Sequence, residues 1–213
     1  MLKLENVTVI YPDKTKAIDN LSFTLDAGEN IALLGESGAG KTSLLLAIAG
    51  ILELAEGTIE INGRQTGLVF QNPDDQLFMP LIYDDIAFGC RNLGLPEEEI
   101  KTRVEETLSR LNISHLQNRS SLKLSCGEKR MAAIATVLSM NPDILMFDEP
   151  TAYLDPKAKR ALAETLKNLQ HEKIIATHDI AFAAEVCNRV IVLKEGRIAA
   201  EGEMDLLKAD LLY

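Results

Sequence analysis

The stretch "GESGAGKT", Gly35–Thr42, decides the fold of this chain. It matches the pattern G-x-x-x-x-G-K-[ST] and lies between the apolar run "IALLG", Ile31–Gly35, and a predicted helix from Gly40 to Leu52. In this strand–loop–helix context the glycines allow backbone N–H groups to converge on phosphate oxygens, and the positive end of the helix adds to the attraction. The structural alternative is a glycine-rich turn with a solvated lysine, and the flanking strand and helix argue against it.

The next step outward supplies the groups that act on a nucleoside triphosphate. Lys41 can reach the β- and γ-phosphates, and the Thr42 hydroxyl can bind Mg²⁺. A second motif, "ILMFDEPT" (Ile144–Thr151), ends an apolar strand with two acids at the sheet edge where the phosphate loop lies. Adjacent residues point in opposite directions, so we expect Asp148 to hold Mg²⁺ through water and Glu149 to polarise the attacking water. The alternative is an Asp-Glu pair that caps a helix.

The rest of the chain falls into stretches of different periodicity. Residues 1–30 and 57–70 have alternating apolar positions and an Asn-Gly turn signal, which predict a small antiparallel β part. Residues 73–125 change to helices and loops. After that, helix–strand alternation predicts right-handed crossovers onto a mostly parallel sheet. Its helices are predicted at 128–140, 156–170 and 179–188, and its strands at 144–147, 173–177 and 189–193.

The predicted fold class is therefore α/β. We expect one domain over residues 1–213: a P-loop nucleoside triphosphatase core, a small N-terminal antiparallel β part and a helical insertion. The clearest helix of the insertion is Pro96–Leu111. Pro96 suits its first position, and the three glutamates that follow suit the positive helix end. Its apolar residues share one face: Ile100, Val104, Leu108 and Leu111.

Composition excludes several classes of protein. A net charge of -10 without any Lys/Arg-rich run argues against sequence-independent nucleic-acid binding. The three cysteines are far apart and lack CxxC spacing, which favours reduced thiols. The N-terminus has no signal-peptide pattern, and the longest apolar stretch, Leu44–Leu52, is far shorter than the roughly 20 residues that span a bilayer. We expect no membrane-spanning segment.

The stretch "LSCGEKR", Leu124–Arg130, has two compatible interpretations. Ser125 and Glu128 are three residues apart, as in a capping box at the start of a helix. A capped helix start with an exposed Ser125 and an exposed Gly127 N–H is also a site for an anion.

Taken together, six motifs in order resemble those of ABC-transporter ATPases, over essentially the whole chain. "GESGAGKT" is similar to the Walker A motif, "VFQNPDDQ" to the Q-loop, "LSCGEKR" to the LSGGQ signature, "ILMFDE" to Walker B, "AYLD" to the D-loop and "IIATHD" to the switch histidine. "FQNPDDQLF" more narrowly resembles the energy-coupling importers for cobalt, nickel and vitamins.

The resemblance implies a head-to-tail pair of subunits with ATP and Mg²⁺ between them. Catalysis would involve Glu149, His178 and Gln71, with His178 at the γ-phosphate and Gln71 reaching both Mg²⁺ and the water. The Mg²⁺ ligands would be Thr42, Gln71 and Asp148. The expected nucleotide-binding residues are Tyr11 (stacked on adenine), Gly35, Glu36, Ser37, Gly38, Ala39, Gly40, Lys41, Thr42 and Ser43. The partner would contribute its signature, Ser125, Cys126, Gly127 and Glu128, and Asp155 would cross the interface.

Two side chains in this set have structural alternatives, and one departs from the family. Tyr11 could be an ordinary strand-end aromatic, and His178 a core histidine at a strand end. Cys126 replaces the first glycine of the signature pair. Its Cβ could crowd the partner's γ-phosphate or force the loop out of a positive-φ geometry, whereas with an ordinary backbone angle it adds only a small apolar group.

The expected function is an ATP-hydrolysing subunit that docks on an integral membrane transporter protein and powers import of a metal ion or vitamin. The active pair would be a homodimer or a heterodimer with a related ATPase, without nucleic acid, in the cytoplasm on the inner face of the cell membrane. Three alternatives remain at this point. They are a soluble ABC ATPase that never meets a membrane, a regulatory subunit in which Cys126 has ended hydrolysis, and a P-loop kinase.

Overall fold

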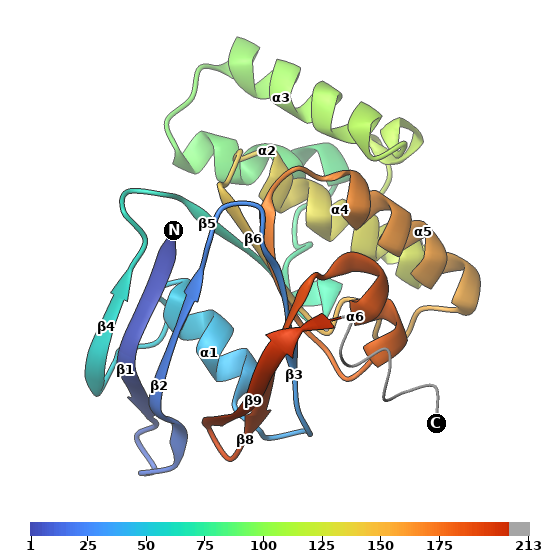
Figure 1. The fold of residues 1–213 in the computed structure, drawn as a ribbon. Coiled ribbons are helices and arrows are strands. Elements are labelled where there is room, and N and C mark those ends of the chain that lie inside the picture. The colour runs from blue at the N-terminus through green and yellow to red at the C-terminus, as the bar shows by residue number, and fades with distance from the viewer. Residues whose placement is uncertain (205–213) are drawn as a thin grey trace.

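Two β-sheets with helix α1 (Lys41–Ile48) between them form the frame of the molecule, as Figure 1 shows. The computed structural model describes residues 1–204. The larger sheet has six strands in the order β5-β6-β7-β3-β8-β9. Five of them are parallel, and β9 pairs antiparallel with β8. The strands are β3 (Asn30–Leu34), β5 (Thr66–Val69), β6 (Ile144–Asp148), β7 (Glu172–Ala176), β8 (Arg189–Lys194) and β9 (Arg197–Glu203).

The smaller sheet is antiparallel and consists of β1 (Leu2–Ile10), β2 (Lys16–Leu25) and β4 (Glu56–Glu60). The prediction that residues 57–70 belong entirely to this antiparallel part is wrong, because β5 pairs in parallel with β6. The turn at Asn62–Gly63 does form, with both residues at positive φ. However, β4 is largely exposed, whereas Val69 is fully buried with Phe147 in the core of the large sheet. Apolar burial therefore carries β5 away from the hairpin partner that the turn suggests.

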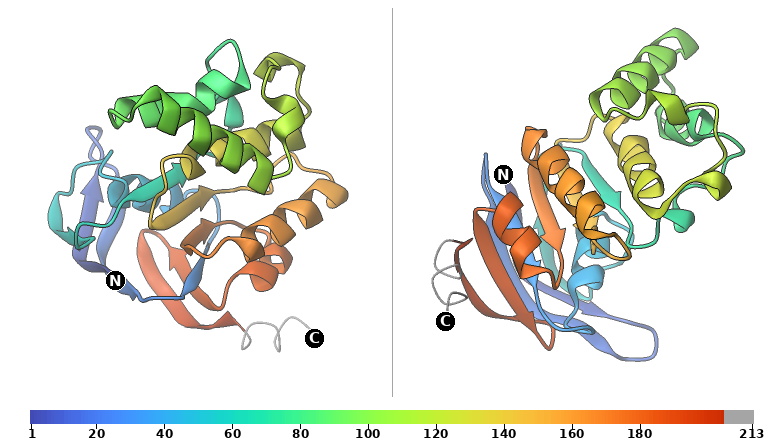
Figure 2. Two further views of the ribbon diagram at one scale, coloured as in Figure 1. Left: turned by 90° about the horizontal axis from the view of Figure 1, so that it is seen from above. Right: turned by 90° about the vertical axis from the view of Figure 1, so that its right-hand side faces the viewer.

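Alternation along the central strands divides the apolar residues into two cores. Ile31 and Leu33 of β3 pack with α1 and the small sheet. Ala32 and Leu34 face the opposite side, which is covered by α4 (Cys126–Leu138), α5 (Pro156–Asn168) and α6 (Ile180–Val186). Figure 2 shows these layers from two further directions. A parallel strand buried on both faces needs apolar side chains at every position, which explains why "IALL" is uninterrupted.

The helical segment packs on α4 away from the small sheet. It contains α2 (Ile82–Asn92), α3 (Glu97–Arg110) and the short 3-10 helices η1 (Pro73–Asp75), η2 (Ser114–Leu116) and η3 (Ser121–Lys123). The predicted apolar face of α3 is buried, and Pro96 is the N-cap rather than the first helical residue. Helix α2 and strand β9 were not predicted as separate elements. No helix within residues 1–204 has the length and apolarity needed to cross a bilayer.

Candidate functional site

The loop between β3 and α1 has a backbone that only glycine permits at its key position. Gly40 has φ +103°, and a Cβ built there would lie 2.4 Å from the carbonyl oxygen of Ala17. Gly40 is also the N-cap of α1, and no side chain among the described residues 1–204 caps this helix end. The first N–H groups of α1 therefore lack the side-chain acceptor that most helices have, which leaves them available to an anion.

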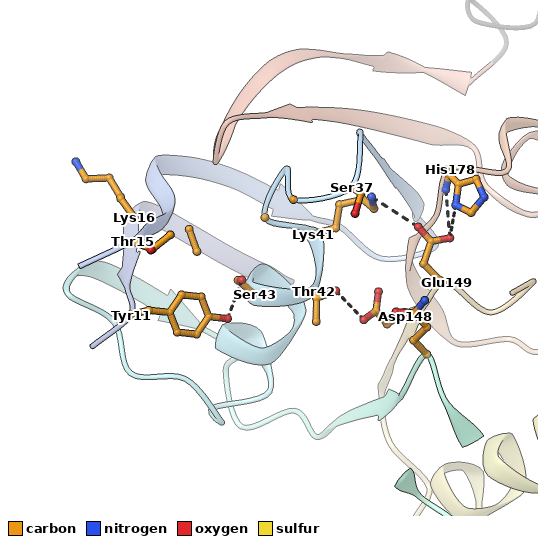
Figure 3. Close-up of a pocket in the computed structure, with 14 residues that line it drawn as sticks. Tyr11, Thr15, Lys16, Ser37, Lys41, Thr42, Ser43, Asp148, Glu149 and His178 are labelled. Carbon is orange, nitrogen blue, oxygen red and sulfur yellow. Dashed lines mark hydrogen bonds and ion pairs between the residues drawn. The ribbon is translucent and has the colours of Figure 1, made fainter. Parts of the chain in front are cut away.

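Lys41 fills the centre of this loop. Its side chain is buried, and Nζ donates to the carbonyl oxygens of Gly35 at 2.7 Å and Glu36 at 3.2 Å. Nζ also lies 3.6 Å from Glu149 Oε1 (Figure 3). The ammonium thus reaches a point between the phosphate loop and the end of β6, where a negatively charged ligand would meet it.

Thr42 and Asp148 meet across the start of α1. The Thr42 hydroxyl donates to Asp148 Oδ2 at 2.8 Å, while Oδ1 is buried and has no hydrogen-bond partner within residues 1–204. Burial raises the pKa of Asp148, because a carboxylate loses its hydration there. A buried carboxylate oxygen without a partner, beside a hydroxyl, has the chemistry of a Mg²⁺ site, since Mg²⁺ prefers hard oxygen ligands. These two residues therefore fit the divalent cation that the motifs imply.

Glu149 follows Asp148 at the end of β6 with φ +42°, a left-handed angle that is uncommon for a residue with a side chain. Its Oε2 lies 2.8 Å from His178 Nδ1, and Thr177 Oγ1 donates to the same oxygen at 3.3 Å. Glu149 is buried, while the His178 side chain is 75% exposed. His178 is therefore not the core histidine that was the alternative, because its ring lies at the surface with one nitrogen held by Glu149.

A cavity of about 630 Å³ brings these groups together. It is of the size that small-molecule sites have. Tyr11 lies at one end, with its hydroxyl 3.0 Å from Ser43 Oγ, and His178 lies at the other (Figure 3). The predicted residues that line the cavity are Tyr11, Ser37, Gly38, Gly40, Lys41, Thr42, Ser43, Gln71, Asp148, Glu149 and His178.

Three lining residues were not predicted from the sequence: Thr15, Lys16 and Ala17. Thr15 ends the turn before β2, where Tyr11 N donates to the Thr15 carbonyl at 2.9 Å, and Lys16 and Ala17 are the first two residues of β2. Pairing of β1 with β2 as a hairpin places all three beside Tyr11. This pairing was not predicted from the sequence, and these three residues were therefore not expected in the site. Gly35, Glu36 and Ala39 do not line the cavity. The first two supply the carbonyls that hold Lys41, and Ala39 is buried beneath the loop.

The residues of "LSCGEKR" lie elsewhere. Ser125, Cys126, Gly127 and Glu128 are absent from the cavity lining and form the start of α4. The capping box is present: Ser125 Oγ accepts from Glu128 N at 3.3 Å, and Ser125 N donates to Glu128 Oε2 at 2.8 Å. Cys126 is exposed and has no positive φ, since it is the first residue of the helix. Its backbone is therefore ordinary, and the cysteine adds a small side chain without forcing the turn.

Asp155 also lies apart from the cavity, as the N-cap of α5. Its Oδ1 accepts from the Ala158 backbone N–H at 2.8 Å. The two preceding positions include Tyr153, which has φ +63° and a side chain that is 83% exposed.

The comparisons with known proteins identify the family. The model of the family described as ABC transporter matches residues 18–152. The chain belongs to the ABC transporter family.

The similar proteins narrow this assignment. The energy-coupling factor transporter ATP-binding protein EcfA of Carboxydothermus hydrogenoformans is 42% identical over 221 residues, which cover 97% of this chain and 82% of that protein. The solved structure of cbiO1 from Clostridium perfringens, part of the ABC transporter complex cbiONQ, has a TM-score of 0.87 and 38% identity, with 99% of this chain and 91% of that one covered. A dimeric ATP-binding cassette, MJ0796, in a post-hydrolysis state with ADP and Pi, has a TM-score of 0.85 and 27% identity, with coverage of 96% and 99%.

These findings confirm the predicted family and fold class. As a member of the ABC transporter family, the chain is the ATP-binding and ATP-hydrolysing subunit of a transporter, related to the energy-coupling and cobalt-type ATPases. Of these similar proteins, the MJ0796 cassette is a dimer and cbiO1 is part of a transporter complex. The P-loop kinase and the ABC ATPase that never meets a membrane are thereby set aside.

Proposed function

We propose that this chain powers an importer of a metal ion such as cobalt or nickel, or of a vitamin, by closing around Mg-ATP as one half of a dimer. The observation that carries the proposal is the single cavity in which the phosphate loop, the Thr42–Asp148 pair and the Glu149–His178 pair meet. The names of EcfA and of the cbiONQ component support the class of cargo.

In this proposal the nucleotide lies along the cavity from Tyr11 to His178. Tyr11 stacks on the adenine, and its hydroxyl bond to Ser43 fixes the ring beside α1. The uncapped N–H groups of α1 and the Lys41 ammonium bind the phosphates, with Lys41 exchanging its bonds to the loop carbonyls for bonds to phosphate oxygens. The residues involved are Tyr11, Gly35, Glu36, Ser37, Gly38, Ala39, Gly40, Lys41, Thr42 and Ser43.

Mg²⁺ would be held by Thr42, Asp148 and Gln71. The unpartnered Asp148 Oδ1 and the exposed Gln71 side chain on the cavity wall support this assignment. When bound, the cation neutralises charge on the phosphate oxygens. These residues of the chain would hold the oxygen ligands of the cation in place at the end of β6.

Glu149 is the proposed general base. Its carboxylate is buried between Lys41 and His178, so it is fixed in position and shielded from bulk water. The water that attacks the γ-phosphate would give its proton to Glu149, while Gln71 orients that water. His178, held through Nδ1, keeps its other ring nitrogen and its exposed edge for the γ-phosphate. The strained φ of Glu149 supports this role, because such angles persist where surrounding structure holds a functional group.

The second half of each site would come from the partner subunit. Ser125, Cys126, Gly127 and Glu128 lie outside the cavity but form an exposed helix start, as a surface that meets another subunit's nucleotide would. Asp155, next to the exposed Tyr153, would cross the same interface. The pair is two copies of this chain, or this chain with a related ATPase.

The proposed location is the cytoplasmic face of the cell membrane, on an integral membrane transporter protein. The helical segment after Gln71 would carry the motion to that protein. Phe78, 61% exposed on this segment beside α2, supports a protein partner on this side of the molecule.

The decisive experiment measures the solution mass of Glu149→Gln by light scattering, with and without Mg-ATP. We expect a monomer that becomes a dimer with Mg-ATP, because the variant binds but does not hydrolyse. The double variant Lys41→Ala, Glu149→Gln is the control and should remain monomeric. A nucleotide-bound monomer would contradict pairing of two copies.

A cellular assay tests the cargo. Cells that lack this gene should lose uptake of one labelled substrate among cobalt, nickel and vitamins. The wild-type gene should restore that uptake, and Glu149→Gln should not. Unchanged uptake of all of them would contradict the importer assignment while leaving ATP hydrolysis intact.

A further inference from the structure

The loop that carries Gln71 is fastened to α4, the helix that begins with the signature residues. Arg130 makes the central contacts: Nη1 donates to the Phe70 carbonyl and Nη2 to the Gln71 carbonyl, each at 2.7 Å. These two carbonyls lie on either side of the Gln71 Cα. The guanidinium therefore fixes the backbone from which the Gln71 side chain extends into the cavity.

Burying an arginine at position 130 costs folding free energy. Arg130 is 1% exposed, and its Nε has no hydrogen-bond partner in the part of the chain that the structure describes. Burial lowers the pKa of Arg130 to about 10, and the attraction of Asp148 opposes that effect, so the guanidinium is charged at neutral pH. A buried charge with an unpaired donor contributes little to stability compared with an apolar side chain of the same volume. The fold alone does not account for an arginine here, whereas geometry at the loop does.

Two further side chains of the same loop, Gln76 and Asp74, hold it to the same helix. Gln76 Oε1 accepts from the Phe70 N–H at 3.2 Å, and Gln76 Nε2 donates to the Thr136 hydroxyl at 2.7 Å. Lys129 Nζ lies 2.5 Å from Asp74 Oδ1 at the surface. The polar residues of "FQNPDDQ" therefore do more than form a turn, because two of them join the loop to α4.

The contacts of Arg130 also fix the position of the Gln71 loop relative to the signature residues at the start of α4. Cys126 and Arg130 are four residues apart and share one face of α4, one turn from each other. A shift of the helix start would move Arg130, and with it the carbonyls of Phe70 and Gln71. One rigid connection thus runs from the surface proposed to meet the partner's nucleotide to the residue proposed to meet this chain's own.

We propose that Arg130 is a positioning residue for Gln71, which fixes the Gln71 backbone and ties it to the signature turn of α4. The inference rests on the proposed role of Gln71 in hydrolysis. Arg130 does not line the cavity and acts only through the loop.

The test is steady-state hydrolysis by Arg130→Lys, which keeps the charge but cannot hold both carbonyls in the fork geometry. We expect kcat to fall roughly 10- to 100-fold, the cost of a small misplacement of a positioned group, with KM for ATP within about threefold. Arg189→Lys is the matched control, since Arg189 also donates to a backbone carbonyl, that of Thr24, but away from the cavity. Its kcat should stay within about twofold.

A double-variant cycle separates positioning from general structure. In a Gln71→Ala background, Arg130→Lys should add less than about a twofold loss, because two residues that act through one effect are not additive. The full loss recurring in that background would overturn the proposal, as would an unchanged kcat in Arg130→Lys.

Hydrogen exchange of the nucleotide-free chain tests whether Arg130 holds the backbone at Gln71, and it does so without measuring hydrolysis. The peptide covering residues 68–78 should exchange faster in Arg130→Lys than in wild type, and at the wild-type rate in Arg189→Lys. Unchanged exchange in Arg130→Lys would overturn the claim that Arg130 fixes the Gln71 backbone. Full turnover in Gln71→Ala alone would instead contradict the proposed role of Gln71 in hydrolysis. The exchange result would still decide whether Arg130 fixes the Gln71 backbone.

Arg130→Met is the second variant, because an apolar side chain of similar size removes the buried charge and leaves the two carbonyls free. It should fold and show the same loss of kcat. Failure of both Arg130 variants to fold, judged by circular dichroism, would overturn the proposal, since Arg130 would then be needed by the fold itself.

Discussion

Helices α1 and α4 begin in opposite ways, and the difference bears on the proposal that each helix start contributes to a different half of the nucleotide site. Helix α1 starts at Gly40 without any side-chain cap, inside the cavity. Helix α4 starts at Ser125 with a complete capping box, outside it. The first end leaves its N–H groups free for an anion within the same chain. The second satisfies two of its own donors, the Ser125 N–H and the Glu128 N–H, through the capping box.

The surroundings of the two ends differ in the same sense. Lys41, Asp148 and Glu149 are buried around the start of α1. Ser125 and Cys126 are exposed at the start of α4. Preorganised, partly dehydrated charges are what a reacting centre needs, whereas an exposed polar turn suits recognition. We therefore expect changes near α1 to affect chemistry and changes at the start of α4 to affect pairing.

The largest expected effect is that of Glu149→Gln on the α1 side. Removing the base should lower kcat by roughly 10²–10⁴-fold while the dissociation constant for ATP stays within about threefold. Single-turnover hydrolysis and fluorescent-nucleotide titration measure the two quantities. Glu172→Gln is the matched control, because Glu172 is a partly buried carboxylate at the far end of β7 and pairs with Arg64. Equal turnover in wild type and Glu149→Gln would contradict the expectation that the residues around the start of α1 carry out the chemistry.

The next effect tests the uncapped helix end itself. Gly40→Ala places a methyl group 2.4 Å from the Ala17 carbonyl oxygen at φ +103°. We expect the free energy of unfolding to fall by about 1–3 kcal/mol and the affinity for ATP to fall roughly tenfold. Urea denaturation and nucleotide titration measure these changes.

Gly28→Ala is the control for Gly40→Ala. Gly28 has φ +81°, but a Cβ at this position would have nothing within 4 Å, so the substitution reports left-handed strain without a clash. It should cost about 1 kcal/mol of stability and leave nucleotide affinity unchanged. Equal losses of affinity in both variants would mean that the close approach at Gly40 is irrelevant to binding.

A smaller effect is expected at the capped end. Ser125→Ala removes the acceptor for the Glu128 N–H and should lower the free energy of unfolding by about 1 kcal/mol. Glu128→Gln keeps a capping-box residue and should cost only a few tenths of that amount, roughly 0.3 kcal/mol. Neither variant should change the ATP affinity of the single chain, because α4 does not line its cavity. A loss of affinity as large as that of Gly40→Ala would erase the contrast between the two ends.

The smallest effect is expected for Cys126→Gly, which restores the family's usual residue. Cys126 already has an ordinary helical backbone and an exposed side chain, so the glycine relieves no strain. In the Glu149→Gln background, the ATP concentration that gives half-maximal dimer should change by less than about threefold, within roughly 0.6 kcal/mol. A tenfold tighter dimer, measured by light scattering, would show that the cysteine obstructs pairing.

Much of this molecule could be predicted from its sequence because the signals are local. The phosphate loop depends on glycines at fixed spacing, and the apolar face of α3 depends on a period of 3.6 residues. Asp148 at the end of β6 and Glu149 directly after it lie at the predicted edge of the sheet, and the capping box at Ser125 needs only a partner three residues on. Each of these features is decided by neighbours in the chain.

Other features depend on residues far apart in the chain. Strand β5 follows a hairpin signal, yet it pairs with β6 because Val69 finds its apolar neighbours there. Residues 15–17 line the cavity only because β2 folds back along β1. No local pattern indicates that Arg130 reaches the Phe70 carbonyl, 60 residues earlier.

The sequence by itself thus determined the family of the fold, the phosphate loop, the acidic pair and the capped start of α4. Those are properties of short segments whose backbone angles and helix ends obey local rules. Only the tertiary structure decided which side chains meet: Glu149 with His178, Thr42 with Asp148, and Arg130 with the loop of Gln71. The physical reason is that buried polar groups find their partners through the packing of the whole core, which no single segment contains.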